Sequence, residues 1–296
     1  MKKYKIIANP KSGNETAIEK ISQIIEIMSE DGCKIDLRLT GKSGDAMEFA
    51  KEDDGEDIII SIGGDGTLNE VVNGIIDSGK EVSLAVLSGG TVNDFATAMK
   101  IPTDVEEFCK MLKAEKTKAV DVGVAGERKF INVAAGGMMT EIAYNVPEEK
   151  KTIFGRAAYY IEALKEVTKL GDRRKKNYFN LKIESEEYTA EEKVLAFICA
   201  NSISVGGFEL APKATVDDGY IDMLIVKDLD LSEIPTLVGN FTRGKHIEHE
   251  KVIYFQTKEM KLSTDKSITV DVDGERAQKL PLTFKVLEKA INLIIK

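Results

Sequence analysis

Continuous apolar runs alternate with segments of helical periodicity through the first part of the chain. The run of Ile58, Ile59, Ile60 and Ile62 is typical of a strand buried on both faces of a parallel sheet. The pattern predicts strands at residues 3–8, 33–40, 58–62 and 82–87, and helices at residues 17–28, 43–52, 68–76 and from near Asn93. Strands that alternate with helices in this way indicate an α/β domain with a parallel sheet.

From Ala119 onward the pattern changes to short strands separated by Gly, Asp and Asn. We predict these strands at residues 119–124, 129–133, 179–183, 194–200, 220–226, 252–257, 268–272 and 282–286, with inserted helices at residues 156–170 and 231–242. The change indicates a second, mainly antiparallel β domain. We place the boundary near Ala125, which gives an α/β domain at residues 1–125 and a β-rich domain at residues 126–286.

The stretch DIIISIGGDGTLNEVVNGII, at residues 57–76, organises the first domain. Its strand is expected to stop at Gly63, where Gly63, Gly64 and Gly66 form a turn with backbone angles closed to other residues. The first N–H groups of the following helix point back at this turn and suit a phosphate. Asp65 places a carboxylate in the middle of the loop. A divalent cation between this carboxylate and a phosphate would remove their repulsion.

Three turns follow predicted strands of the sheet, at residues 9–13, 63–67 and 88–91. Ligands of such sheets bind outside the carboxyl ends of the strands, so we expect the three turns to converge on one ligand. Neither a Gly-x-x-x-x-Gly-Lys-Ser/Thr run nor a Gly-x-Gly-x-x-Gly run occurs in the sequence. The alternative is a glycine-rich turn that only joins a strand to a helix.

Composition narrows the class of protein. The 296 residues suit two domains, and a hydrophobic fraction of 43% can fill their cores. No apolar run approaches the roughly 20 residues that span a bilayer, and no signal peptide precedes the first strand, so we expect a cytoplasmic protein. A net charge of −9 argues against general nucleic-acid binding. Three scattered cysteines argue against a disulfide framework and a zinc site. His246 and His249 are interpreted as solvated surface residues.

Positive charge gathers in residues 150–182, which hold ten Lys or Arg residues and three acidic ones. An amphipathic helix is predicted there, followed by the basic run at residues 173–176. Anionic membranes attract such clusters by about 1 kcal/mol per basic residue. We therefore expect transient, peripheral docking at the inner face of the membrane. A core-packed helix with a solvated basic end is the alternative.

Three carboxylates outside the glycine-rich turn also suit phosphoryl transfer or metal binding. Glu275 follows the hairpin turn of Asp273 and Gly274, where it can act as a general base or be a solvated turn residue. Asp121 lies in an apolar strand, where it either faces outward or needs a partner. Asp218 forms a carboxylate pair with Asp217 before a glycine, which suits an oxygen-ligated magnesium ion or a plain turn.

Short motifs occur in order along nearly the whole chain: NP at residues 9–10, GGDGTLNEVVNG at 63–74, GTVNDFA at 90–96, AVDVG at 119–123, FGR at 154–156, DDGYID at 217–222 and DGE at 273–275. Together they resemble the soluble bacterial diacylglycerol kinases and related lipid kinases. Sphingosine kinases and NAD kinases share the GGDGT core, but the extension through Gly74 makes the match specific. Ser88 and Gly89 depart from the proline and aliphatic residue that many members carry there, which leaves the shape of this turn open.

The resemblance implies transfer of the γ-phosphoryl group of ATP, with Mg²⁺, to the hydroxyl of diacylglycerol at the membrane surface, giving phosphatidate. It implies an α/β nucleotide-binding domain like that of NAD kinase and phosphofructokinase, rejoined by residues 287–296, and a β-sandwich domain for the lipid. The positions that match nucleotide-binding residues of the family are Asn9, Pro10, Lys11, Ser12, Gly13, Thr40, Gly64, Asp65, Gly66, Thr67, Leu68, Asn69, Glu70 and Thr91.

The resemblance also implies catalytic and metal-binding roles. Glu275 matches the proton acceptor of the family, with Asp65 and Asp121 beside it. A structural magnesium site matches Thr215, Asp218 and Tyr220, the last through its carbonyl.

Two other functions remain open at this stage. One is phosphorylation of a different hydroxyl, in a sphingoid base, a polyprenol or NAD, although the extension at residues 69–74 disfavours NAD. The other is a nucleotide-binding regulator without turnover, which the presence of Asp65, Asp121 and Glu275 disfavours. A homodimer is compatible with the sequence.

Overall fold

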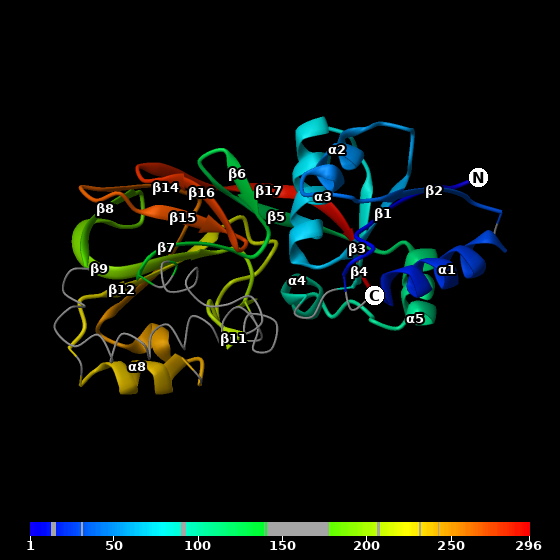
Figure 1. The fold of residues 1–296 in the computed structure, drawn as a ribbon. Helices are drawn as coiled ribbons and strands as arrows, with labels where there is room; N and C mark the ends of the chain where they lie inside the picture. The colour runs from blue at the N-terminus through cyan, green and yellow to red at the C-terminus, as the bar shows by residue number, and fades with distance from the viewer. Residues whose placement is uncertain are drawn as a thin grey trace. The chain divides into compact units, whose positions relative to one another are not determined.

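The computed structural model describes residues 1–12, 16–30, 32–89, 93–138, 140, 178–205, 208–230, 232–241 and 243–296. Gly13, Thr91, the predicted helix at residues 156–170 and the basic run at residues 173–176 lie outside the described residues. The chain divides into two compact units (Figure 1). Unit 1 comprises Met1–Val120 and Lys289–Lys296, and unit 2 comprises Asp121–Glu288. Unit 1 therefore contains residues from both ends of the chain.

Unit 1 contains a parallel sheet. Its strands lie in the order β2 (Lys34–Leu39), β1 (Lys3–Ala8), β3 (Ile58–Gly63), β4 (Ser83–Ser88) and the end of β17 (Leu282–Ile294). Ile6 of β1 pairs with Leu37 on one side and Ile60 on the other, and Leu293 of β17 pairs with Leu84 of β4. All residues of β3 are buried, because its isoleucines pack on both faces of the sheet. The predicted parallel α/β architecture of the N-terminal part is confirmed.

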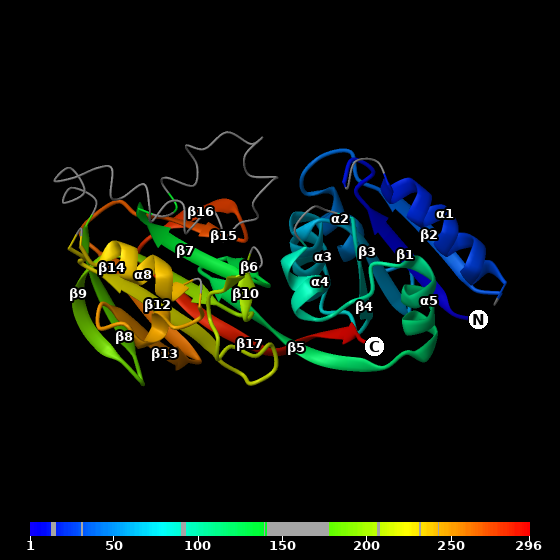
Figure 2. The same ribbon diagram turned by 90° about the horizontal axis from the view of Figure 1, so that it is seen from below.

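Helices cover both faces of this sheet. α2 (Asp45–Lys51) and α3 (Asp65–Ser78) pack together on one side of the strands, and α1 (Thr16–Ser29) and α5 (Val105–Ala114) pack together on the other (Figures 1 and 2). The short α4 (Asp94–Ala98) follows β4. α1, α2 and α3 each return the chain to the same end of the sheet, so the carboxyl ends of β1, β3 and β4 meet at one edge.

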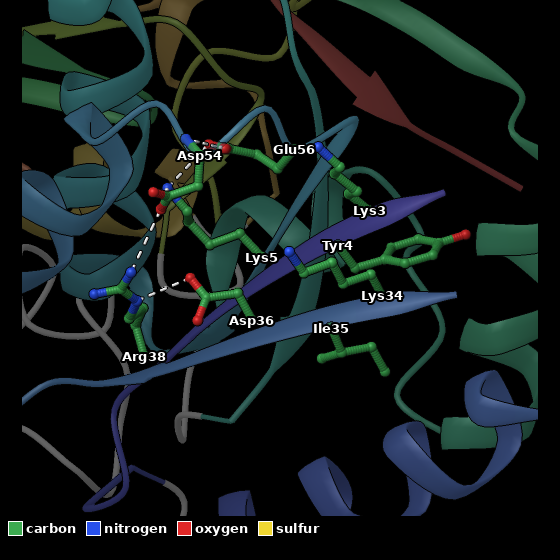
Figure 3. A pocket seen from close by; sticks show the side chains of 9 residues that line it. All are labelled: Lys3, Tyr4, Lys5, Lys34, Ile35, Asp36, Arg38, Asp54 and Glu56. Carbon is green, nitrogen blue, oxygen red and sulfur yellow. Dashed lines mark hydrogen bonds and ion pairs between the residues drawn. The ribbon is translucent and has the colours of Figure 1, made fainter. Parts of the chain in front are cut away.

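A buried lysine forms an ionic cluster in unit 1. The Lys5 side chain is fully buried, and its Nζ lies 2.9 Å from Asp54 Oδ2 and 3.1 Å from Glu56 Oε1. It also donates to the carbonyl of Phe49, at the C-terminal end of α2. Figure 3 shows Lys5 beside Asp54 and Glu56 in a pocket of about 260 Å³. A buried cation is tolerable there because carboxylates and helix-terminal carbonyls surround it.

Glu56 contributes pH-dependent stability through this cluster. Burial by itself would raise the pKa of Glu56, but hydrogen bonds from Lys80, the backbone and Lys5 outweigh burial and lower the pKa from 4.5 to about 2. A carboxyl whose pKa is lower in the folded state stabilises the fold above its ordinary pKa. This stabilisation is lost as the pH falls from 4.5 toward 2.

We expect Glu56→Gln to lower the free energy of unfolding at pH 7 by about 3 kcal/mol. Because the variant lacks the titrating group, its unfolding free energy should fall less steeply between pH 4.5 and pH 2 than that of the parent. Urea unfolding at several pH values measures both quantities. Parallel curves for parent and variant in this pH range would contradict the assignment.

Unit 2 consists mainly of antiparallel strands. Its central path runs through β16 (Glu275–Lys279), β15 (Thr269–Val272), β7 (Val133–Gly137), β9 (Thr189–Ala200), β8 (Phe179–Ser185), β14 (Glu259–Thr264) and β17. β12 (Ile221–Lys227) pairs with β9 and β13 (Val252–Thr257), and β5 (Thr117–Ala125) pairs with β17 and β6 (Arg128–Phe130). β10 (Ser204–Val205) and β11 (Phe208–Glu209) form a separate pair. The predicted antiparallel, β-rich C-terminal part is confirmed.

The second part of β9, residues 194–200, and β12 form the centre of unit 2, because both faces of these segments are buried. On one face, Leu195 of β9 and Leu224 of β12 belong to the same core as Leu237 of α8 (Ile234–Phe241). On the other face, Phe197 of β9 packs edge-on against Phe284 of β17, with 5.9 Å between the ring centroids. Alternate side chains of these strands therefore serve two cores.

His246 corrects one interpretation of the sequence. Its side chain is fully buried rather than solvated: Nε2 lies 2.8 Å from the carbonyl of Leu210, and the ring stacks on Phe241 with 4.0 Å between centroids. Burial lowers the pKa of His246. His249 is half-buried, and its Nδ1 accepts a hydrogen bond from the Lys251 N–H.

No helix in the described part of the chain is long and apolar enough to cross a bilayer.

Candidate functional site

Three turns of unit 1 are joined at the carboxyl edge of its sheet. The Asn9 N–H donates to the carbonyl of Ile62 at 2.9 Å, and the Gly89 N–H donates to the carbonyl of Gly63 at 2.9 Å. A side chain on Gly89 would approach Ser12 Oγ to 2.8 Å. The described parts of the three turns are therefore close together, and Gly89 leaves room for the first turn.

The turn after β3 differs from the expectation in two respects. Gly63, Gly64 and Gly66 all avoid positive φ, so these glycines are not needed for unusual backbone angles. Gly63 is needed for space, because a Cβ there would lie 2.6 Å from the Thr67 side chain. α3 begins at Asp65, which places this carboxylate in the first turn of the helix rather than in the middle of a loop.

Asp65 connects the start of α3 with the start of α4. Its side chain is buried, and Oδ2 accepts the Asp94 N–H at 3.4 Å. At the start of the helix the Leu68 N–H donates back to Gly64, so the preceding N–H groups belong to the free first turn of α3. The position of a Cβ on Gly66 has open space around it. An anion can therefore approach the N-terminus of α3 at Gly66.

Glu70 performs a structural task that the sequence did not indicate. Its carboxylate accepts the Gly44 N–H at 2.8 Å, the Ala46 N–H at 3.1 Å and the Ser43 hydroxyl at 3.1 Å. Glu70 of α3 therefore caps the N-terminus of α2 and fixes the loop that follows Thr40. The Thr40 N–H donates to the carbonyl of Ala8, at the end of β1.

The other predicted nucleotide-binding residues differ in how far their side chains are exposed and in their hydrogen-bond partners. Leu68 is buried, so its side chain belongs to the core. Asn69 Oδ1 accepts a hydrogen bond from Asn73 within α3. In the first turn, the Lys11 side chain is exposed and its N–H donates to Asn9 Oδ1 at 3.0 Å. The described residues Asn9–Ser12, Thr40 and Gly64–Glu70 all lie in unit 1.

In unit 2, Glu275 is presented by a tight hairpin. Val272 of β15 pairs with Glu275 of β16, and the two residues between them, Asp273 and Gly274, have φ of 47° and 88°. This is the geometry of a two-residue primed turn, which the Asp-Gly sequence favours. The Glu275 side chain is exposed, and Oε2 lies 3.4 Å from the Arg128 guanidinium.

Asp121 faces inward and is tied to the predicted metal loop. Its side chain is buried, Oδ2 accepts the Gly219 N–H at 2.7 Å, and its own N–H donates to the carbonyl of Val216 at 2.6 Å. These bonds fix the segment that contains Asp218 and Tyr220. Asp218 Oδ1 accepts the Tyr220 N–H at 3.0 Å, as in an Asx turn.

Thr215 and Asp218 are exposed, so their oxygen atoms and the Tyr220 carbonyl offer a donor set that a hard cation accepts. Within the described residues, no group of three or more His, Cys, Asp or Glu side chains is arranged to hold a metal ion. Burial raises the pKa of nearby Asp222 to about 6, and hydrogen bonds from Tyr254 and Gln256 offset this only in part.

Family models match both halves of the chain. Residues 3–125 match the diacylglycerol kinase catalytic domain, and residues 132–295 match the YegS C-terminal NAD kinase beta sandwich-like domain. Together with the parallel and antiparallel parts of the fold, these matches define a kinase with a catalytic domain followed by a β-sandwich-like domain.

Full-length relatives identify the family. The chain is 35% identical to diacylglycerol kinases of Staphylococcus carnosus (strain TM300) and Staphylococcus aureus (strain JH9), over 99% of its own length and 94% and 92% of theirs. A diacylglycerol kinase structure from Bacillus anthracis str. Sterne has a TM-score of 0.81 and 25% sequence identity, with 100% of this chain and 97% of that chain covered. The chain belongs to the diacylglycerol kinase family.

Proposed function

We propose that this kinase transfers the γ-phosphoryl group of ATP to the hydroxyl of diacylglycerol, giving phosphatidate, and that the reaction depends on magnesium. One observation carries the proposal: the three turns joined around the N-terminus of α3, in a chain 35% identical to diacylglycerol kinases over nearly its whole length. Phosphoryl transfer needs positioning and charge neutralisation more than covalent chemistry, and this arrangement suits both.

In this proposal unit 1 binds the nucleotide. The amides of the first turn of α3 and the turn at Asn9–Ser12 receive the phosphates, and Gly63 and Gly89 keep the turns close together. Asp65 supplies a carboxylate beside the phosphates, and a magnesium ion there would neutralise the charge between them. Glu70 contributes by fixing the loop after Thr40 rather than through a free carboxylate.

Unit 2 supplies the acid–base chemistry. Glu275 accepts the proton of the lipid hydroxyl as that oxygen forms a bond to the γ-phosphorus, the bond from the γ-phosphorus to the bridging oxygen breaks, and ADP leaves. The Asp121 carboxylate holds the Gly219 N–H, so we assign it a positioning role for the loop of Thr215, Asp218 and Tyr220. Those three residues are proposed to hold a structural magnesium ion through oxygen atoms.

The acceptor is tested with purified protein, labelled ATP, magnesium and mixed micelles that contain diacylglycerol, a sphingoid base or a polyprenol. We expect label in phosphatidate and loss of transfer when magnesium is chelated. Label in another lipid would show that this lipid, and not diacylglycerol, is the acceptor. Nucleotide binding without transfer to any lipid would indicate a nucleotide-binding regulator.

Docking to anionic membranes, proposed from the basic residues 150–182, is tested in the same assay with vesicles. Transfer to diacylglycerol in vesicles should be faster when anionic lipid is present, and the difference should shrink in high salt. Equal rates in neutral and anionic vesicles would argue against docking.

A further inference from the structure

Asp273 is a buried carboxylate with an unusual set of partners. Its Oδ2 accepts the Ile131 N–H at 2.8 Å, and its Oδ1 accepts the Asn132 N–H at 3.1 Å and the Val133 N–H at 2.9 Å. The Asp273 N–H returns a bond of 2.9 Å to the carbonyl of Val133. One side chain therefore satisfies three consecutive main-chain donors, and an ionised carboxylate makes such bonds strong.

We propose that Asp273 is the positioning residue for Glu275. Asp273 is the first residue of the two-residue turn, and Glu275 follows that turn directly. The second turn residue is held as well, because the Gly274 N–H donates to Asp271 Oδ1 at 2.8 Å. The main chain just before the proposed base is thus fixed at two successive residues. This inference rests on the proposed function, in which Glu275 is the proton acceptor.

The segment that Asp273 binds is itself anchored. The Asn201 N–H donates to the carbonyl of Asn132 at 2.9 Å, and Asn201 Nδ2 lies 3.2 Å from the carbonyl of Ile131 and 2.9 Å from that of Asp121. Hydrogen bonds therefore run without a break from the turn before Glu275 to Asp121. The turn is attached to the interior of unit 2 and not only to its own hairpin.

Asp273→Asn is the sharpest substitution, because asparagine also adopts the positive φ of this position and keeps one acceptor oxygen. Its amide group would meet a main-chain N–H where Asp273 offers an oxygen. Displacing a catalytic group by about 1 Å can lower the rate about 100-fold. We therefore expect Asp273→Asn to lower kcat about 10- to 100-fold, with little change in the KM for ATP.

The decisive measurement is a double-mutant cycle with Glu275→Gln. If Asp273 acts through Glu275, Asp273→Asn lowers kcat in the parent but lowers it little further once the base has been removed. A merely structural role would lower kcat by the same factor in both backgrounds. Equal factors, or an unchanged kcat in Asp273→Asn, would overturn the positioning role while leaving the proposed function intact.

Two further variants complete the test. Ser185→Ala is the matched control, because Ser185 makes the corresponding side-chain bonds to Tyr188 in the β8–β9 turn, and kcat should stay unchanged. If Asp273→Asn does not fold, Asp271→Asn weakens the hold on Gly274 and should show the same dependence on Glu275 with a smaller loss. A parent protein that transfers phosphate to no lipid would overturn the proposed function and the inference together.

Discussion

Glu275→Gln should lower kcat for lipid phosphorylation by about 10²- to 10⁴-fold, which is the usual contribution of a positioned general base. The substitution preserves the size of the side chain but removes its ability to accept the hydroxyl proton. The KM for ATP should change little, because the proposed nucleotide-binding residues lie in unit 1 and Glu275 lies in unit 2. Steady-state kinetics with diacylglycerol micelles and a direct nucleotide-binding titration separate the two effects.

A matched control is available in the same unit. Glu127 is also an exposed glutamate of a hairpin turn, between β5 and β6, so Glu127→Gln should retain full activity. If Glu275→Gln keeps more than about a tenth of the parental kcat, a loss far smaller than general bases give, Glu275 is not the base.

Lys5→Met should lower the free energy of unfolding by about 3–5 kcal/mol, the typical cost of removing one member of a buried ion pair. The Glu56 side chain is 3% exposed and contacts two lysines, Lys5 and Lys80. Without Lys5, this buried carboxylate keeps only the contact with Lys80. The carbonyl of Phe49 loses its lysine donor in the same variant. Urea or thermal unfolding measures the loss.

Lys34→Met is the control for this variant. Lys34 lines the same pocket but is exposed (Figure 3), so its replacement should change the unfolding free energy by less than about 0.5 kcal/mol. Similar unfolding free energies for Lys5→Met and the parent would show that the buried cluster contributes no net stability. Some buried ion pairs behave in this way when hydrophobic residues replace them.

The fold could be predicted from the sequence because its signals are local. The isoleucines of β3 and the apolar stripe of α1 show their periods within a few residues, and the change at Ala119 separates the two architectures. β14 was missed, since only Met260 and Leu262 of that strand are apolar and charged residues surround them. The start of α3 was misplaced, because glycines on both sides of Asp65 hide the helical period.

The candidate site was harder to predict, because its decisive contacts join distant residues. Glu70 caps a helix from which it is separated by a strand, and Asp273 binds main-chain groups of residues 131–133. The neighbouring Arg243 and Lys245 favour a solvated His246, but its side chain is buried against the carbonyl of Leu210, a residue distant in the sequence. Local patterns predict which residues carry chemistry, whereas the partners of their side chains depend on the tertiary fold.

The strand β17 has a consequence for how the protein is made. Its final residues pair with β4, so one strand of the parallel sheet of unit 1 follows unit 2 in the chain, whereas the other four precede it. During synthesis the first 120 residues emerge long before this strand, and unit 2 is translated in between. The edge of β4 that β17 covers therefore stays unpaired until residues 292 and 293 have been translated, so unit 1 cannot complete its sheet before unit 2 has been made.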